Sequence, residues 1–349
     1  MTVFLISYLC VLLLYPFFKC KKNGKRLYCV LTALCYFLIA ALRSRTVGFD
    51  TDIYVNAFLR LSGMPLSSAI AYSNKDVGFW VLLSLLGKVL PDYTILFMIV
   101  AGLFTVSTWH LIYKYSADPR LSIIVLLAFN LYQFTLTGMR QTIAMSFIMW
   151  ALDACYQKRT LRSIIFICIG SVFHSSALVF ILVVLLMKYK KELDHAHTFA
   201  IALILGIVFL LRGGIAQRLI VFVQDRGYEV TMTNGGLTMT FVIFALFLLG
   251  CLFIREYSFA DENATLSYMI AMIACFFEML VSTQSIFFRV AFYFLLIYII
   301  FVPNVIQTIQ HDSSRRLVKA SVYVLLSIQY LVFTVSSCGI VPYQTFWQV

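Results

Sequence analysis

Residues 157–191 read QKRTLRSIIFICIGSVFHSSALVFILVVLLMKYKK, and this stretch determines how the whole chain is interpreted. An apolar run, 161–187, lies between two basic clusters at 157–162 and 188–191. One membrane-spanning helix needs about 20 apolar residues, and basic loops tend to stay on the cytoplasmic side of a membrane. Because both flanks are basic, the run predicts two short helices that form a hairpin, with its turn near His174 on the outer side.

The composition of the chain is typical of a membrane protein. Of its 349 residues, 62% are hydrophobic and 12% are charged, whereas soluble proteins carry about 25% charged residues. We therefore expect an all-α, polytopic integral membrane protein with about 12 (11–14) transmembrane helices. The clearest candidate spans lie near 2–18, 27–43, 93–112, 121–136, 137–157, 198–211, 237–255, 264–282, 287–308 and 317–337.

The net charge of +12 comes mainly from short basic clusters between the apolar runs. This distribution indicates cytoplasmic loops and not a nucleic-acid partner. The nine cysteines show no paired spacing that indicates zinc or a disulfide framework, and Asp194, His195 and His197 lie in a basic loop without a second cluster. We predict no metal site. Basic residues follow the first apolar run, so we expect it to be a retained helix.

The basic clusters predict one membrane domain, 1–349, with external loops at 43–75 and 212–236. The clusters at 19–26, 157–162, 188–191 and 315–319 are expected to be cytoplasmic. An even number of crossings must then separate the loop 43–75 from Arg140, yet three apolar stretches lie between them. The shortest, 76–90, is bounded by Gly78 and Pro91, and we interpret it as a partial or re-entrant helix.

This topology gathers unusual polar residues on the outer face. A charge at bilayer depth costs about 2.5–3.5 kcal/mol on insertion scales, so such residues usually line a cavity or pair with each other. Arg140 either binds an oxyanion or extends to lipid head groups, and His174 is either a general base or a capping residue. Glu278 is either functional or paired with an arginine. The complete set is Arg43, Arg45, Asp50, Asp52, Tyr54, Asp76, Arg140, Gln141, His174, Glu278, Arg289 and Tyr293.

Five short motifs occur in order along the chain. They are LRSRTVGFDTDIY at 42–54, KDVGF at 75–79, TGMRQTIA at 137–144, VFHSSAL at 172–178 and RVAFYF at 289–294. In this order and spacing they resemble the motifs of the EpsG family of Wzy-like membrane glycosyltransferases. The resemblance covers most of the chain before the last forty residues.

The resemblance implies a GT-C-like membrane glycosyltransferase that polymerises O-antigen, capsule or exopolysaccharide. Such an enzyme joins polyprenyl-diphosphate-linked oligosaccharide repeat units at the periplasmic or exterior face of the bacterial cytoplasmic (inner) membrane. It needs no cofactor and no nucleotide sugar. Its expected partners are the lipid-linked oligosaccharide, membrane lipids, a chain-length regulator and a flippase.

The candidate roles follow from this chemistry. Arg140 and Arg289 are expected to bind the diphosphate, helped by Arg43 or Arg45, because a guanidinium matches phosphate oxygens. Either Asp50 or His174 is the base, and Glu278 is a third candidate. The other expected substrate-binding residues are Tyr54, Asp76, Gln141 and Tyr293. Two alternatives remain open from the sequence: a related glycan ligase, and a flippase or transporter of lipid-linked oligosaccharide.

Overall fold

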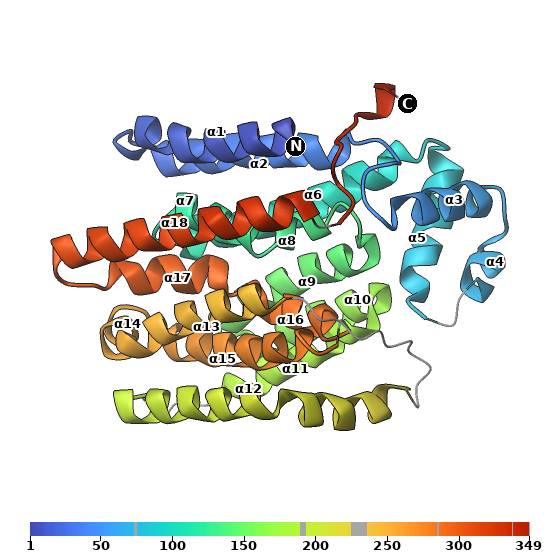
Figure 1. Ribbon diagram of the computed structural model, residues 1–349. Helices are drawn as coiled ribbons and strands as arrows, with labels where there is room; N and C mark the ends of the chain where they lie inside the picture. The colour runs from blue at the N-terminus through green and yellow to red at the C-terminus, as the bar shows by residue number, and fades with distance from the viewer. Residues whose placement is uncertain (73–74, 189–192, 225–235, 285, 337, 349) are drawn as a thin grey trace.

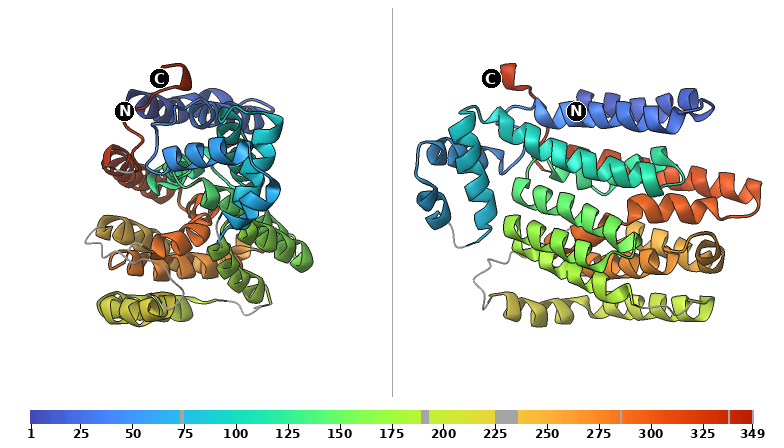
Figure 2. Two further views of the ribbon diagram at one scale, coloured as in Figure 1. Left: turned by 90° about the vertical axis from the view of Figure 1, so that its right-hand side faces the viewer. Right: turned by 180° about the vertical axis from the view of Figure 1, so that it is seen from behind.

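The computed structural model describes every residue of the chain other than 73–74, 189–192, 225–235, 285, 337 and 349. Most of the long helices lie side by side with their axes roughly parallel, as Figures 1 and 2 show. The helices are α1 (Thr2–Lys19), α2 (Gly24–Ala41), α3 (Thr51–Ser62), α4 (Leu66–Ala71), α5 (Val77–Val89), α6 (Thr94–Tyr115), α7 (Pro119–Ala128), α8 (Leu131–Phe134), α9 (Met139–Tyr156), α10 (Thr160–Phe173), η1 (Ser175–Phe180), α11 (Ile181–Leu186), α12 (His195–Gln224), α13 (Leu237–Leu252), α14 (Ile254–Ala260), α15 (Ala264–Val281), α16 (Phe287–Leu295), α17 (Tyr298–Gln307), α18 (Asp312–Ser336) and η2 (Phe346–Gln348).

Several of these helices are long and apolar enough to cross a membrane. In the described part of the chain, five single helices meet that criterion: α1, α2, α6, α12 and α15. The pairs α13–α14 and α16–α17 bend by 72° and 42°, and counting each as one span gives up to seven. The expectation of an all-α, polytopic membrane protein is confirmed at this level.

The outer surface of the bundle is apolar, as contact with lipid requires. Large side chains such as Leu210 (77% exposed), Phe17 (70%) and Phe241 (57%) project from it. Exposure of this kind is unfavourable in water but neutral among lipid tails. The most apolar window of α12 is 17% buried and that of α15 is 67% buried, so α12 lies at the edge of the bundle and α15 inside it.

Secondary structure differs from the sequence-based expectation in two segments. The segment 43–75, expected as a loop, contains the helices α3 and α4. The segment 212–236, also expected as a loop, begins as helix, because α12 continues to Gln224 through further apolar residues. Residues 189–191 and 225–235 of the predicted loops lie outside the described residues.

The helices α3, α4 and α5 gather at one end of the bundle, which we call the α3–α5 end (Figure 1). There α5 runs across the direction of the long helices, in agreement with a partial helix at 76–90. A separate apolar cluster, which includes Phe58, Phe79, Leu96 and Ile143, joins α3 and α5 to α6 and α9. This packing fixes the start of α5 relative to the start of α9.

The opposite end of the bundle carries many of the cations, and we call it the basic end. Lys158 pairs there with Glu262 at 2.6 Å, and Lys25 donates to the carbonyl oxygen of Ser116 at 2.7 Å. Lys19 and Arg315, at the end of α1 and the start of α18, lie at the same end. The chain therefore separates its basic loops from the α3–α5 end.

The run 161–187 is interrupted at His174, as the sequence predicts. Helix α10 ends at Phe173, His174 adopts an extended backbone conformation (φ −154°, ψ 109°), and η1 starts at Ser175. The following η1 and α11 pack back against α10. The interruption positions the imidazole of His174 at the same end as α5.

Candidate active site

A buried carboxylate, that of Asp76, lies at the centre of a polar cluster at the α3–α5 end. Asp76 immediately precedes α5 in a left-handed conformation (φ 54°) and is 9% exposed. Its carboxylate accepts hydrogen bonds from His174 Nδ1 at 2.9 Å, from Arg140 Nη1 at 3.0 Å and from the Ser175 backbone N–H at 3.0 Å. We call Asp76, Arg140 and His174 the Asp76 cluster.

The surroundings of Asp76 favour its ionised form. Burial alone raises the pKa of this carboxyl, because low polarity penalises charge. The hydrogen bond and charge of His174, the N–H of Ser175 and the charge of Arg140 outweigh that penalty and hold the pKa below its ordinary value. Asp76 is therefore an anion at neutral pH.

The ionised Asp76 determines which nitrogen of His174 carries the proton. Nδ1 must donate to the carboxylate, so in the neutral ring Nε2 has the free lone pair. Nε2 is buried and has no hydrogen-bond partner among the described residues. A carboxylate that orients a histidine in this way leaves Nε2 able to accept a proton from a substrate hydroxyl.

Arg140 is held by aromatic rings as well as by Asp76. Its guanidinium carbon lies 5.4 Å from the ring centre of Trp80 and 5.8 Å from that of Tyr54. The side chain remains 27% exposed. The guanidinium is therefore paired within the polar cluster, and part of it is still accessible to solvent.

The start of α16 adjoins the cluster and brings a further cation. Gln141 Nε2 donates to the carbonyl oxygen of Arg289 at 2.8 Å, and the hydroxyl groups of Tyr293 and Ser176 lie 3.3 Å apart. The Arg289 side chain is exposed, has no ion-pair partner among the described residues, and interacts electrostatically with Tyr54 and Tyr293. It is available to an anionic ligand.

The first motif reaches the same region through Asp50. The Asp50 backbone N–H donates to Thr137 Oγ1 at 3.0 Å, and its side chain interacts electrostatically with Tyr54 and Arg140. Arg45 instead pairs with Asp52, its Nε lying 2.6 Å from Oδ1, and with Asn56. Arg45 thus supports the exposed face of α3.

Two further expected site residues, both buried, lie apart from the Asp76 cluster. Arg43 is 1% exposed, with its guanidinium carbon 4.2 Å from the ring centre of Phe97, and it donates to the carbonyl oxygen of Ala40. Glu278 is 3% exposed and lines an apolar pocket of about 360 Å³ together with Asp50 and Phe292. The Glu278 carboxyl has no hydrogen-bond or ion-pair partner among the described residues, so no arginine pairs with it there.

Sequence reasoning missed two contributors to the site, Trp80 and the backbone of Ser175. Trp80 lies four residues after Asp76, which places it one helical turn along α5, and its indole N–H donates to the carbonyl oxygen of Lys75 at 3.1 Å. The spacing from Asp76 was the available signal. The N–H of Ser175 became visible only once the backbone at His174 was known.

Comparison with known proteins identifies the family. The EpsG family model matches residues 26–345, nearly the whole chain, and all three residues of the Asp76 cluster lie within that match. No curated protein and no solved structure matches the chain. The family is associated with Wzy-type polysaccharide polymerases. The chain belongs to the EpsG family.

Proposed function

We propose that this protein is a membrane glycosyltransferase that joins polyprenyl-diphosphate-linked oligosaccharide repeat units into polysaccharide. The observation that carries the proposal is the Asp76 cluster, in which Nε2 of His174 has no partner among the described residues. The exposed Arg289 adjoins it. A base and a free cation side by side are what glycosyl transfer from a diphosphate requires.

The reaction assigns one step to each group. His174 Nε2 accepts the proton of an acceptor sugar hydroxyl, whose oxygen bonds to the anomeric carbon of the donor as the carbon–oxygen bond to the diphosphate breaks. The diphosphate departs with the bonding electrons, and Arg289 and the exposed part of Arg140 stabilise its charge. Asp76 stabilises the imidazolium that forms.

His174 is a better candidate base than the two carboxylates that the sequence also suggested. Asp50 is exposed to solvent, and no hydrogen bond to the described residues orients its carboxylate. Glu278 lies in a mainly apolar pocket. Tyr54 and Tyr293, expected to bind substrate, are buried (5% and 1% exposed), so in this proposal they support the Arg140 guanidinium and the Ser176 hydroxyl.

The site faces outward in this proposal. The Asp76 cluster lies at the α3–α5 end, whereas Lys19, Lys158 and Arg315 lie at the basic end, which the positive-inside rule assigns to the cytoplasm. With α7–α8, α9, α10, and η1–α11 counted as crossings beside the longer helices, the chain crosses about 12 times in a GT-C-like arrangement. Lipid-linked repeat units on the outer leaflet then reach the site directly.

Complementation of a deletion strain tests the proposal. His174→Ala is expected to leave single repeat units on the lipid carrier, while His311→Ala, which alters an exposed histidine at the basic end, keeps long chains. Carrier-linked glycan is resolved by gel. Long carrier-linked chains in the His174→Ala strain would indicate a ligase, and repeat units trapped on the cytoplasmic leaflet would indicate a flippase; either result overturns the proposal.

A further inference from the structure

A large cavity lies at the basic end, far from the Asp76 cluster along the bundle. It has a volume of about 740 Å³ and lies between α1, α7, α17 and α18. Five cationic side chains line it against two acidic ones, and Tyr15, Pro303 and Ile306 add apolar walls. The cations are Lys19, Arg120, Arg315, Arg316 and Lys319, and the acids are Asp118 and Asp312.

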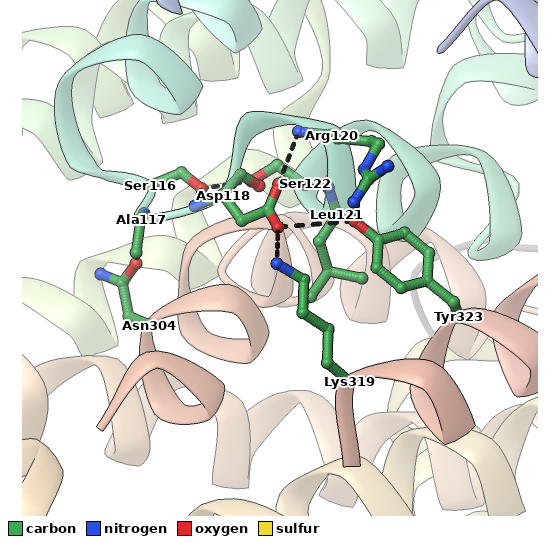
Figure 3. A network of polar contacts seen from close by, with 9 residues as sticks. All are labelled: Ser116, Ala117, Asp118, Arg120, Leu121, Ser122, Asn304, Lys319 and Tyr323. Atoms are coloured by element: carbon green, nitrogen blue, oxygen red, sulfur yellow. Dashed lines mark hydrogen bonds and ion pairs between the residues drawn. The ribbon is translucent and has the colours of Figure 1, made fainter. Parts of the chain in front are cut away.

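Interactions within the protein already engage both acids. Asp118 pairs with Lys319, accepts the Arg120 backbone N–H at 3.1 Å, and lies 3.5 Å from the Tyr323 hydroxyl, as Figure 3 shows. Asp312 pairs with Arg315. The charge of Lys19, Arg120 and Arg316 is therefore not neutralised by an acidic partner among the described residues.

The guanidinium of Arg120 is held in place with its fork free. Its carbon lies 5.1 Å from the ring centre of Tyr15 and 4.9 Å from that of Tyr323, and its Nε donates to the Tyr323 hydroxyl at 2.9 Å. Neither terminal nitrogen has a hydrogen-bond partner among the described residues. A fixed guanidinium with two free donors matches a phosphate group and loses little entropy on binding it.

An apolar groove starts where this cavity ends. A second hollow of about 320 Å³ shares Arg120 with the cavity, and Tyr323, whose ring lies against the Arg120 guanidinium, lines this hollow. It continues between α1 and α18 along Leu12, Val324, Ser327, Ile328 and Leu331. Val324 and Ile328 are 59% and 57% exposed, so the groove is open on the side that faces lipid.

We propose that this cavity and groove form a binding site for an anionic phospholipid. The phosphate lies at Arg120 with Lys19 and Arg316 close by, and a hydrocarbon tail follows the groove between α1 and α18. A soluble phosphate explains the cations but leaves the adjoining apolar groove unused. A neutral lipid explains the groove but leaves the three cations unpaired.

Native mass spectrometry of the purified full-length protein tests this site. The probes are dioleoyl-phosphatidylglycerol, dioleoyl-phosphatidylcholine and inorganic phosphate. Two variants test the two parts of the site separately: Arg120→Gln removes the charge, and Ile328→Trp fills the groove from a position that is itself 57% exposed. Arg255→Gln is the matched control, because it removes an exposed cation of α14 at the same end but outside the cavity.

We expect phosphatidylglycerol to bind in preference to phosphatidylcholine, and Arg120→Gln to weaken that binding about tenfold, the effect of one charge-assisted hydrogen bond. Ile328→Trp weakens it as well, while Arg255→Gln does not. The proposal is overturned if the two lipids bind equally, or if the two site variants bind phosphatidylglycerol as the unaltered protein does. It is also overturned if inorganic phosphate binds equally to the unaltered protein and to Ile328→Trp and displaces the lipid. Should Arg120→Gln fail to fold, Ile328→Trp decides the outcome alone.

Discussion

The imidazole of His174 and the carboxylate of Asp76 lie 2.9 Å apart, although 98 residues separate them in the sequence. Asp76 stands at the start of α5, and His174 at the interruption between α10 and η1. The contact joins a helix that lies across the end of the bundle to one that runs along it (Figure 1). The proposed chemistry depends on this junction.

We expect Arg140→Ala to abolish long glycan chains while the protein remains inserted. The change removes one partner of a buried carboxylate, which costs up to about 3–5 kcal/mol of stability. Arg140→Lys retains a charge but not the planar fork, so we expect shortened chains. The measurement is chain length by gel, together with the amount of protein in the membrane.

Arg60→Ala is the control for Arg140, because Arg60 is exposed, and its guanidinium carbon lies 5.9 Å from the ring centre of Tyr72, outside the Asp76 cluster. It is expected to keep chains of normal length. Normal chains in the Arg140→Ala strain would remove Arg140 from the mechanism.

We expect the stability of the Asp76→Asn variant to change less on acidification than that of the unaltered protein. The pKa of Asp76 in the folded protein lies below its value of about 3.9 in an unfolded chain, so the carboxylate stabilises the fold fully above that pH and progressively less below it. We expect the melting temperature of the unaltered protein to exceed that of Asp76→Asn by a constant amount from pH 7 to about 5. The difference then narrows as the pH falls below about 4.

Thermal unfolding in detergent at several pH values measures this difference. Asp52→Asn serves as the control, since Asp52 is exposed and its partners among the described residues are Arg45 and Asn56 at the surface. If the difference in melting temperature between the unaltered protein and Asp76→Asn widens on acidification, the Asp76 carboxyl is not stabilised in its charged form.

Gly78→Ala is expected to separate α5 from α10. A methyl group at Gly78 would meet the carbonyl oxygen of Val172 at 2.9 Å and also its side chain, so α5 must move away from the segment that ends at His174. Overpacking of this kind costs about 1–3 kcal/mol. We predict shorter chains and a lower melting temperature.

Gly63→Ala provides a matched comparison, because a methyl group there meets nothing within 4 Å. If Gly78→Ala and Gly63→Ala give the same chain length and the same melting temperature, close packing of α5 on α10 does not position the site.

Glu278→Leu distinguishes a catalytic glutamate from a buried one. The Glu278 carboxyl lacks a partner among the described residues, and burying an unpaired polar group costs about 1–3 kcal/mol. We therefore expect Glu278→Leu to raise the melting temperature and Glu278→Gln to keep long chains. Loss of long chains in the Glu278→Gln strain would show that the Glu278 carboxyl takes part in the reaction.

Much of the helical pattern was predictable because lipid imposes long apolar runs. The interruption at His174 followed from the basic clusters on both sides of a run too long for one helix. The helices α3 and α4 were missed, since they are short and mix polar with apolar residues, whereas only long apolar runs indicate membrane spans. The bends in α13–α14 and α16–α17 were not predicted, because an apolar pattern does not record where a helix bends.

The sequence identified the three residues of the Asp76 cluster but did not predict that the Asp76 carboxylate binds both His174 and Arg140. Asp76 was expected among the substrate-binding residues, whereas its carboxylate holds His174 and Arg140. Arg43 resembled a site residue because it stands in the same motif as Asp50, yet it packs against Phe97. Whether a charged side chain faces a cavity or a ring depends on the rotation of its helix, and this rotation is fixed only by neighbouring helices.

The single carboxylate shared by a histidine and an arginine also constrains how this protein can evolve. Three codons from distant parts of one gene specify this unit, and in the proposed mechanism each residue acts through the other two. We therefore expect a change at any one of them to lower activity until the others change as well. We expect descendants to inherit the three residues together or to exchange them together.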